Sequence, residues 1–274
     1  MLEIKYLNLD VTTLCNLQCF GCAHGMPYTG DPDYQSVQAI TNFFEYIKKA
    51  PFPIRVNEFR LLGGEPLLVK NIDEFANEAI KYIDLIDRLS LTTNGTLNSD
   101  AIMNKLEPFK EHLNIIVTIH SKEPALFKKT MQTIIKFKQR GFNVKEWDAT
   151  GYWGLDLHYT KDSIKPDNSD SLVAWGNCRK TRERRQLNLN SVSFCPITDN
   201  LHRTLKKTGQ LDDPEWKKYL EMEQEYKIDF TKCTYQEFVE FMVGGPRDFC
   251  SMCIHDHPNI ENKPVLFKDW VNIS

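Results

Sequence analysis

The sequence predicts an α/β fold, with a partial (β/α)6 TIM-like barrel in the first 160 residues and a small α+β domain behind it. Short apolar runs alternate with amphipathic stretches through the first half of the chain, which is typical of β/α units around a parallel sheet. After about residue 160 the pattern changes to polar loops, short strands and charged helices. Because β/α crossovers are right-handed, successive units curl the sheet one way and favour a barrel.

The elements of the first part follow in order along the chain. Strands are expected at Tyr6–Val11, Glu58–Leu62, Arg88–Thr93, Ile115–His120 and Asn143–Trp147, with Leu155–Tyr159 as a candidate sixth strand. Helices are expected between them at Ser36–Lys49, Asn71–Ile86, Ser99–Lys110 and Pro124–Arg140. In the last helix Phe127, Met131 and Ile134 have the three-and-four spacing that places one apolar stripe on a core.

The second part, residues 161–274, begins with a polar loop, KDSIKPDNSDS, that is typical of a linker. Leucine, valine and phenylalanine at positions 187, 189, 192 and 194 fit two short strands around Asn190 and Ser191. Helices are expected at Asp213–Tyr226 and Thr234–Met242, and the run GGP at 244–246 ends the second one. We therefore expect two domains, residues 1–160 and residues 161–274.

Composition excludes several classes of protein. The 274 residues include 34 Lys and Arg against 37 Asp and Glu, for a net charge of -3, so no basic excess favours a nucleic-acid partner. The longest apolar stretches, such as Leu113–Ile119, are far shorter than the roughly 18 residues of a membrane-spanning helix. The first ten residues do not have the pattern of a secretory signal. We expect a soluble cytoplasmic protein with no membrane partner.

Eight cysteines fall into two groups separated by 155 residues without a cysteine. In a reducing compartment, clustered cysteines favour metal binding or chemistry over structural disulfides. The first group, Cys15-x3-Cys19-x2-Cys22, follows the first predicted strand, on the barrel face that carries active sites. Three thiolates from one loop can hold three irons of a cubane [4Fe-4S] cluster and leave the fourth open. The alternative is zinc on these three thiolates and His24.

A second motif, Gly63-Gly64-Glu65-Pro66, follows the second predicted strand on the same face. Two glycines permit close backbone approach and unusual dihedral angles. Exposed amide and carbonyl groups in such a segment can meet a small charged ligand. At the ends of neighbouring strands, the two motifs together are specific.

Together the motifs resemble the radical S-adenosylmethionine (SAM) superfamily, which has CxxxCxxC after the first barrel strand and GGEP after the second. The resemblance covers roughly residues 4 to 150. It implies a [4Fe-4S] cluster on Cys15, Cys19 and Cys22. The amine and carboxylate of S-adenosyl-L-methionine would chelate the unique iron of that cluster. The same resemblance assigns cofactor contacts to Gly63, Gly64, Glu65, Thr93, Asn94, Thr118, His120 and Ser121.

Family members often carry an aromatic residue directly before the third cysteine, near adenine. Here that position is Gly21 and the aromatic residue is Phe20, which becomes the candidate adenine contact. The resemblance implies reductive cleavage of the cofactor to methionine and a 5'-deoxyadenosyl radical, which abstracts hydrogen from a substrate C–H bond. It also implies an electron donor such as flavodoxin or ferredoxin.

The second group, Cys178, Cys195, Cys250 and Cys253, places one cysteine before the predicted hairpin, one after it and two in a distant CxxC. Zinc and an iron-sulfur cluster both fit four thiolates. The arrangement resembles the twitch domain, the shortened relative of the SPASM domain, which carries one auxiliary [4Fe-4S] cluster. The layout is similar to that of 2-deoxy-scyllo-inosamine dehydrogenase. Cys233 is left over as a small half-buried residue, an alternative ligand or a hydrogen-atom donor.

Four thiolates would close the auxiliary cluster's coordination sphere and leave it an electron acceptor. The resemblance then implies a net two-electron oxidation of a small molecule such as a sugar or an aminocyclitol. One alternative is a maturase that forms a thioether, a cross-link or an epimer in a peptide. An alternative of a different class is a non-catalytic zinc or iron-sulfur module. The sequence identifies neither the substrate nor the general base.

Overall fold

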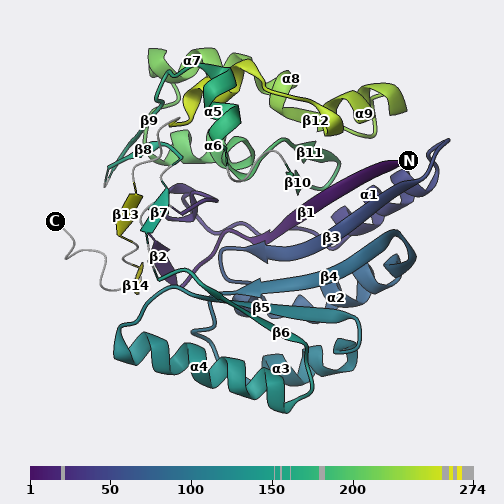
Figure 1. Ribbon diagram of the computed structural model, residues 1–274. Helices are drawn as coiled ribbons and strands as arrows, with labels where there is room; N and C mark the ends of the chain where they lie inside the picture. The colour runs from purple at the N-terminus through teal and green to yellow at the C-terminus, as the bar shows by residue number, and fades with distance from the viewer. Residues whose placement is uncertain are drawn as a thin grey trace.

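A computed structural model describes residues 1–19, 22–150, 152–154, 156–160, 162–178, 183–254, 259–261 and 264–266. Its centre is one eight-stranded sheet in the order β12-β11-β10-β1-β3-β4-β5-β6 (Figure 1). The five strands expected in the barrel are all present and parallel: β1 (Leu2–Thr12), β3 (Ile54–Gly63), β4 (Ile86–Thr93), β5 (Leu113–Ile119) and β6 (Val144–Asp148). The curled parallel sheet confirms the α/β part-barrel.

The sixth parallel strand lies at an unexpected place. β10 (Arg184–Leu187) pairs in parallel with β1, so the strand is added at the other edge of the sheet. β11 (Ser191–Ser193) and β12 (Lys227–Asp229) continue from it as antiparallel strands. The predicted hairpin around Asn190 is therefore real. One sheet is shared by the two parts of the chain.

The expectation of a sixth strand at Leu155–Tyr159, beside β6, was wrong. Within the described residues only β8 (His158–Tyr159) forms there, and it pairs antiparallel with β9 (Ile164–Lys165). A tight turn closed by the Thr160 amide on the Ser163 carbonyl, at 2.9 Å, reverses the chain after two residues. Such a short strand cannot run along β6.

Four helices on the outer face of the sheet cover the apolar side of its strands: α1 (Gln38–Lys48), α2 (Ile72–Ile80), α3 (Asp100–Leu106) and α4 (Pro124–Gln139). All four were expected, but two end early. α2 stops at Ile80, and Ile86, expected in the helix, already begins β4. After α3, Pro108 lacks the amide that would extend the helix, and a 3-10 turn follows.

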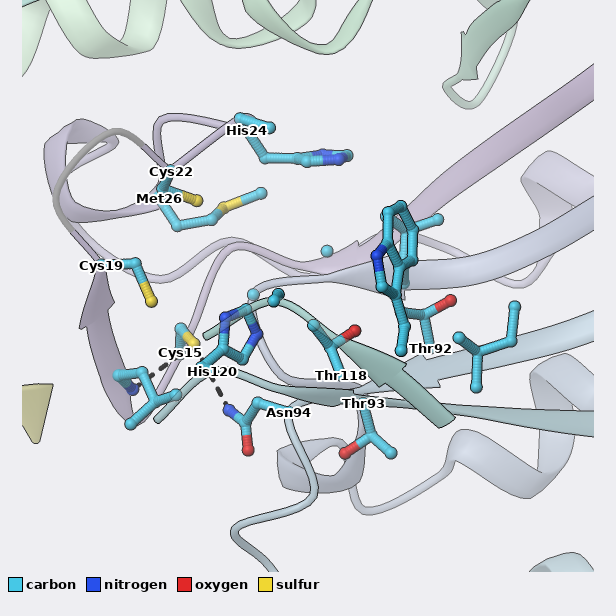
Figure 2. A pocket seen from close by; sticks show the side chains of 18 of the residues that line it. Cys15, Cys19, Cys22, His24, Met26, Thr92, Thr93, Asn94, Thr118 and His120 are labelled. Atoms are coloured by element: carbon cyan, nitrogen blue, oxygen red, sulfur yellow. Dashed lines mark hydrogen bonds between the residues drawn. The ribbon is translucent and has the colours of Figure 1, made fainter. Parts of the chain in front are cut away.

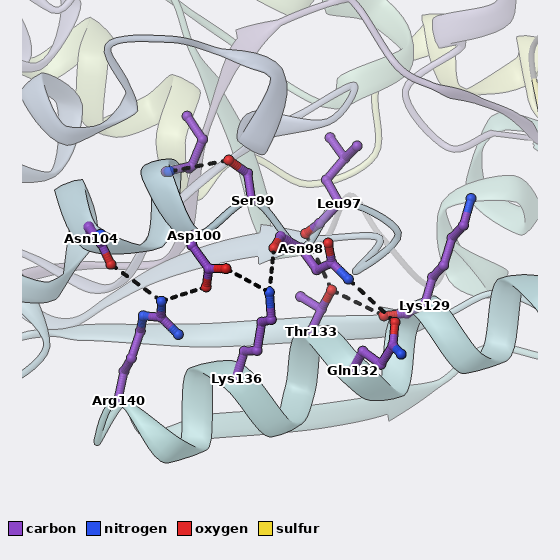
Figure 3. Close-up of polar contacts among 11 residues, drawn as sticks. Leu97, Asn98, Ser99, Asp100, Asn104, Lys129, Gln132, Thr133, Lys136 and Arg140 are labelled. Atoms are coloured by element: carbon purple, nitrogen blue, oxygen red, sulfur yellow. Dashed lines mark hydrogen bonds and ion pairs between the residues drawn. The ribbon is translucent and has the colours of Figure 1, made fainter.

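Surface polar contacts fasten α4 to the segment after β4 (Figure 3). The Lys136 ammonium donates to the Asn98 carbonyl and the Asp100 carboxylate, each at 3.0 Å, and Arg140 donates to the same carboxylate at 2.6 Å. The Thr133 hydroxyl reaches the Leu97 carbonyl at 3.3 Å. These contacts position the loop that leaves the carboxyl end of β4, where the site lies.

The helices of the second part gather along β10, β11 and β12 (Figure 1). They are α5 (Ser171–Asn177), α6 (Pro196–Lys207), α7 (Pro214–Glu221), α8 (Glu223–Tyr226) and α9 (Tyr235–Val243). The single helix expected at Asp213–Tyr226 is two helices, because the backbone leaves the helical region at Met222. α9 was expected, and Thr234 caps it by accepting from the Glu237 amide.

The two parts share a hydrophobic core. The Phe43 ring of α1 contacts the rings of Phe230 and Phe238 at centroid distances of 5.7 and 6.3 Å. Two pairs of short strands complete the described structure: β2 (Leu17–Cys19) with β14 (Pro264–Leu266), and β7 (Tyr152–Gly154) with β13 (Asn259–Glu261). No helix among the described residues has the length and apolarity needed to cross a membrane.

Candidate active site

A cavity of about 550 Å³ opens at the carboxyl ends of the parallel strands (Figure 2). All three cysteines of the first motif line it, together with Gly63, Gly64, Thr93 and Asn94 from the ends of β3 and β4. The remaining wall is formed by Asn8, Leu17, Ala23, His24, Met26, Arg60, Leu62, Thr92, Ile116, Thr118, His120, Trp147, Asp148, Ala149, Asp156 and Arg184. The structure thus brings together the two motifs that the sequence singled out.

The cysteine loop is held by its own backbone turns. The Cys22 amide donates to the Cys19 carbonyl at 3.1 Å, and the Gly25 amide donates to the Cys22 carbonyl at 2.9 Å. Burial raises the pKa of Cys15 to about 12. Burial and then the neighbouring thiols of Cys22 and Cys15 raise the pKa of Cys19. Three thiols that share one cavity wall fit a three-thiolate cluster.

The Cys15 sulfur also accepts hydrogen bonds from its surroundings. The Leu17 amide lies 3.4 Å from it and the Asn94 side-chain amide 3.9 Å. Asn94 is oriented in turn by Asn16, whose side-chain oxygen accepts from it at 2.9 Å, and by Thr96, whose hydroxyl donates to it at 2.6 Å. Donors on a thiolate stabilise its charge and tune an iron-sulfur site.

The two glycines bring the backbone of the GGEP segment against the cysteine loop. The Gly64 amide donates to the Thr12 carbonyl and the Glu65 amide to the Leu14 carbonyl, both at 2.8 Å. A Cβ on Gly64 would lie 2.1 Å from the Leu14 oxygen, and Gly63 has a φ of 132°. No other residue type fits here, since side chains avoid both this contact and this dihedral.

Glu65 is completely buried, and its carboxylate is used within the protein. It accepts hydrogen bonds from the Leu67 amide at 3.0 Å, the Thr93 hydroxyl at 2.6 Å and the Asn94 amide at 2.7 Å. Burial raises its pKa to about 7, against the lowering effect of these three donors. The side chain therefore ties the end of β3 to the end of β4.

Ser121, which was also expected at the cofactor, is not among the residues that line the cavity. Its hydroxyl accepts from the Glu123 amide at 3.0 Å just before α4. Thr118 and His120, which were expected at the cofactor from the same strand end, do line the cavity. Burial lowers the pKa of His120 to about 4, which keeps its ring neutral. Phe20 lies outside the described residues.

His24, the fourth ligand of the zinc alternative, is buried and bonded to a carboxylate. Its Nδ1 lies 3.0 Å from the Asp10 oxygen. Across the described part of the chain, no three His, Cys, Asp or Glu side chains are grouped closely enough to hold a single metal ion.

The second cysteine group also comes together in space. Cys178 follows α5, Cys195 precedes α6, and Cys250 and Cys253 lie in the 3-10 turn Asp248–Met252 and directly after it. Burial raises the pKa of Cys195 to about 12, and nearby Cys178 and Cys250 raise it further. The pKa of Cys253 is raised by burial and by all three of the other thiols.

Two cationic side chains flank this second group. Arg185 is buried, donates to the Phe194 and Met242 carbonyls and packs its guanidinium 4.1 Å from the centre of the Phe194 ring. The Arg247 guanidinium lies 5.7 Å from the centre of the same ring. Guanidinium groups beside four thiols favour the thiolate form and an anionic cluster.

Asp156 lies between the two groups. It lines the cavity, and its carbonyl accepts from the Ile254 amide, directly after Cys253, at 2.9 Å. The Asp156 charge also raises the pKa of Cys253. Tyr28 and Tyr159 stack nearby with ring centroids 5.3 Å apart. The charge of Cys22 contributes to the raised pKa of both rings, so both lie near the first group.

Cys233 lies apart from both groups. Its sulfur is 3.8 Å from the hydroxyl oxygen of Tyr46 on α1, and its side chain packs against the hydrophobic core. It does not line the cavity. This placement favours its role as a half-buried packing residue.

Sequence reasoning missed several wall residues, above all Asn8, Arg60, Asp156 and Arg184. A signal for Asn8 was available in the first strand. Leu7, Leu9 and Val11 alternate there with Tyr6, Asn8 and Asp10. Such alternation predicts that one face of the strand is apolar and the other polar. Since the helices cover the apolar face, the polar face turns toward the barrel interior.

Three comparisons with known proteins bear on this site. The model of the radical SAM superfamily matches residues 9–155. The probable GTP 3',8-cyclase of Methanococcus aeolicus is 25% identical over 287 residues, which cover 97% of this chain and 87% of that protein. The GTP 3',8-cyclase of Limosilactobacillus fermentum is 27% identical over 221 residues, which cover 76% of this chain and 59% of that protein.

Among solved structures, the one described as "Native anSMEcpe with bound AdoMet and Cp18Cys peptide" aligns with 95% of this chain and 93% of its own. Its sequence identity is 14% and its TM-score is 0.47.

Proposed function

This chain belongs to the radical SAM superfamily and is a radical SAM enzyme, and on that premise we propose that it oxidises an alcohol carbon of a polar small molecule by two electrons. The cavity would hold the reacting parts of substrate and cofactor. The first cysteine group would start the reaction there, and the second would receive the electron that the substrate loses. Asp156, which lines the cavity and lies near the second cysteine group, would receive the hydroxyl proton of the substrate.

Cys15, Cys19 and Cys22 would hold the [4Fe-4S] cluster, because their thiols share one cavity wall. The ammonium of S-adenosylmethionine needs acceptors, and the Glu65 carboxylate and carbonyl already accept within the protein. The backbone carbonyl oxygens of Gly63 and Gly64 would therefore accept from the ammonium. When bound, cluster and cofactor supply the one-electron cleavage that yields a hydrogen-abstracting 5'-deoxyadenosyl radical.

The observation that carries the proposal is the place of Asp156. Only 5% of its surface is exposed, it lines the cavity, and its carbonyl accepts from the residue that follows Cys253. A carboxylate at this position can take the hydroxyl proton of a substrate radical. The same radical would then lie beside the second cysteine group.

Cys178, Cys195, Cys250 and Cys253 would hold the auxiliary [4Fe-4S] cluster and supply a one-electron acceptor. Four thiolates leave it no open iron for the substrate. The balance closes without an added oxidant. One hydrogen atom leaves as 5'-deoxyadenosine, one proton goes to Asp156 and one electron goes to the acceptor. The alcohol carbon becomes a carbonyl carbon.

A second candidate function rests on the names of relatives. Proteins called GTP 3',8-cyclase match nearly the whole chain, so cyclisation of a purine nucleoside triphosphate is the alternative for this cavity. A peptide maturase remains a third outcome of the same assay. The three differ in product: loss of two hydrogens from a small molecule, an isomeric ring in a nucleotide, or a modified peptide.

Anaerobic reconstitution followed by product analysis tests the proposal. We expect about eight irons per chain and release of 5'-deoxyadenosine that depends on reductant. Deuterium at the carbinol carbon of an oxidised substrate should appear in 5'-deoxyadenosine. Assays with sugars, sugar phosphates, aminocyclitols and GTP, read by mass spectrometry, choose among the candidates. A GTP-derived isomer with no oxidised small molecule would reject the oxidation.

Two cysteine variants separate the sites. The triple substitution of Cys15, Cys19 and Cys22 by Ala should keep about four irons and release no 5'-deoxyadenosine. Substitution of Cys250 and Cys253 by Ala should also keep about four irons, but it should still release 5'-deoxyadenosine and yield no oxidised product. Asp156→Asn should lower the rate of product formation more than that of deuterium transfer. Loss of all iron in either cysteine variant would contradict the assignment of ligands.

A further inference from the structure

The inner face of the sheet is polar across neighbouring strands. Asn8 of β1 lies opposite Gln186 of β10 and Arg60 of β3 in the strand register. Opposed residues in a parallel sheet project from the same face. Asn8 and Arg60 line the cavity, so this row forms its floor. Arg184, two residues before Gln186, projects from the same face and lines the cavity too.

Two side chains of this row are buried without hydrogen-bond partners among the described residues. The Asn8 side-chain oxygen has none, and Asn8 is 1% exposed. Neither polar atom of the Gln186 side chain has one, and Gln186 is completely buried. An unsatisfied buried polar atom is costly and rarely tolerated without a purpose. Asn8 faces the cavity, where a ligand can reach it.

The charges around the floor favour an anion. Arg60 lies 4.0 Å from the centre of the Tyr6 ring, and its Nε donates to Glu58 at 2.8 Å. Glu58 also accepts from Arg88 at 3.2 Å, so one carboxylate serves two guanidinium groups. Burial and then the charge of Arg60 lower the pKa of Arg184.

Two acids elsewhere on the cavity wall do not reverse this balance. Asp148 is bonded to Thr150 at the exposed rim. The Asp156 carbonyl accepts from the residue after Cys253. The Asp156 charge also reaches Arg184, but burial and the charge of Arg60 outweigh it and lower the pKa of Arg184. The floor itself therefore presents two guanidinium groups and an amide. Guanidinium groups bind phosphate and carboxylate through paired hydrogen bonds, and amide side chains bind hydroxyl groups.

We propose that Asn8, Arg60 and Arg184 form a recognition subsite for an anionic group, a phosphate or a carboxylate, carried on a hydroxylated substrate. The inference rests on the proposed function, because it names the substrate class of the same cavity. The two arginines bind the anion from either side of β1. The amide of Asn8 binds a neighbouring hydroxyl. The bound substrate supplies the hydrogen-bond partner that the Asn8 side-chain oxygen lacks.

Binding to the reconstituted full-length protein with S-adenosylmethionine tests the subsite. The probes are inorganic phosphate, glucose 6-phosphate, gluconate and glucose, measured by calorimetry. We expect the charged probes to bind at least about 10-fold more tightly than glucose. Arg184→Gln should weaken binding of the charged probes by about 10-fold or more. Arg203→Gln removes an arginine that is paired with Asp33 on the outer surface. This control should leave binding of the charged probes unchanged.

Asn8→Leu distinguishes binding from a structural role. Asn8 has an unpartnered oxygen, so leucine of similar size should raise the Tm by about 2–4 °C and still weaken binding of glucose 6-phosphate, which carries hydroxyl groups. The matched control is Asn114→Leu, on the same row. Asn114 donates to the Leu89 carbonyl at 3.0 Å, so its loss should lower the Tm.

The subsite is supported if the charged probes bind more tightly than glucose, if this advantage disappears in Arg184→Gln, and if Asn8→Leu has a raised Tm. Equal binding of glucose and the charged probes, equal binding by Arg184→Gln, or a lowered Tm in Asn8→Leu overturns it. Release of 5'-deoxyadenosine by the wild-type protein is scored separately. If the wild-type protein released no 5'-deoxyadenosine, the proposed function would be rejected, and the binding measurements would still decide whether the subsite exists.

Discussion

The hydroxyl of Thr93 donates a 2.6 Å hydrogen bond to the buried carboxylate of Glu65. Glu65 therefore connects two strand ends beneath the cysteine loop, and its amide holds that loop through the Leu14 carbonyl. Because Glu65 is completely buried, the geometry of the site depends on its hydrogen bonds as much as on the cysteines.

Glu65→Gln should destabilise the protein. The carboxylate accepts from three donors. In glutamine, the side-chain NH2 group would replace one of the two oxygens and face a backbone N–H, so two donors would oppose each other. We expect a loss of about 1–3 kcal/mol in the free energy of unfolding, measured by urea denaturation. Glu146→Gln removes an exposed carboxylate paired with Lys138 and is the control. Equal effects of the two substitutions would refute a positioning role for Glu65.

Gly64→Ala should disrupt the first cysteine site. An added Cβ would lie 2.1 Å from the Leu14 carbonyl oxygen, so the GGEP segment or the cysteine loop must move. We expect a loss of about 3 kcal/mol or more in unfolding free energy and a lower iron content after reconstitution. Gly245→Ala is the matched control, because nothing lies within 4 Å of its added Cβ. Full iron content in Gly64→Ala would show that the close approach is not needed.

Cys233→Ala should leave both proposed iron sites intact. The thiol packs beside Tyr46 and does not line the cavity, so its removal should cost only about 1 kcal/mol of unfolding free energy. Iron analysis and the 5'-deoxyadenosine assay measure the outcome. A drop in iron content would instead make Cys233 a ligand.

The parts of the fold that follow from local pattern could be predicted from the sequence. The five β/α strands have apolar periodicity. The GGEP glycines are required by the close backbone approach that follows when β1 pairs with β3. The edge at which β10 joins could not be predicted, because β10 is four residues long and its partner β1 lies some 180 residues earlier. Strand pairing over such a separation depends on tertiary packing that no local pattern reports.

The same limit applies to the site. The cysteines and the GGEP segment are motifs and could be found by spacing. Asp156 and Arg184 reach the cavity only because β10 joins β1 and the chain after β6 turns back toward Cys253. Residues placed by long-range pairing have no signature in sequence spacing, and in our proposal these residues recognise the substrate.

Stability should depend on pH through Asp199. Burial and then the nearby charge of Asp10 raise the pKa of Asp199 to about 6, above its unfolded value near 3.9. The folded protein therefore binds this proton more readily than the unfolded chain. The stabilising contribution is present below about pH 4 and is lost as pH rises through about 6.

Asp199→Asn isolates this effect. One Asp199 oxygen accepts from the Ser193 hydroxyl at 2.7 Å and from the Asn188 amide, and the asparagine oxygen can keep both bonds without a charge facing Asp10. The variant should match the wild type near pH 4 and be more stable by about 1–3 kcal/mol at pH 8. Urea denaturation at both values measures the difference, with Asp212→Asn as the exposed control. A wild type that is the more stable protein at pH 8 would show that the charged Asp199 stabilises the fold.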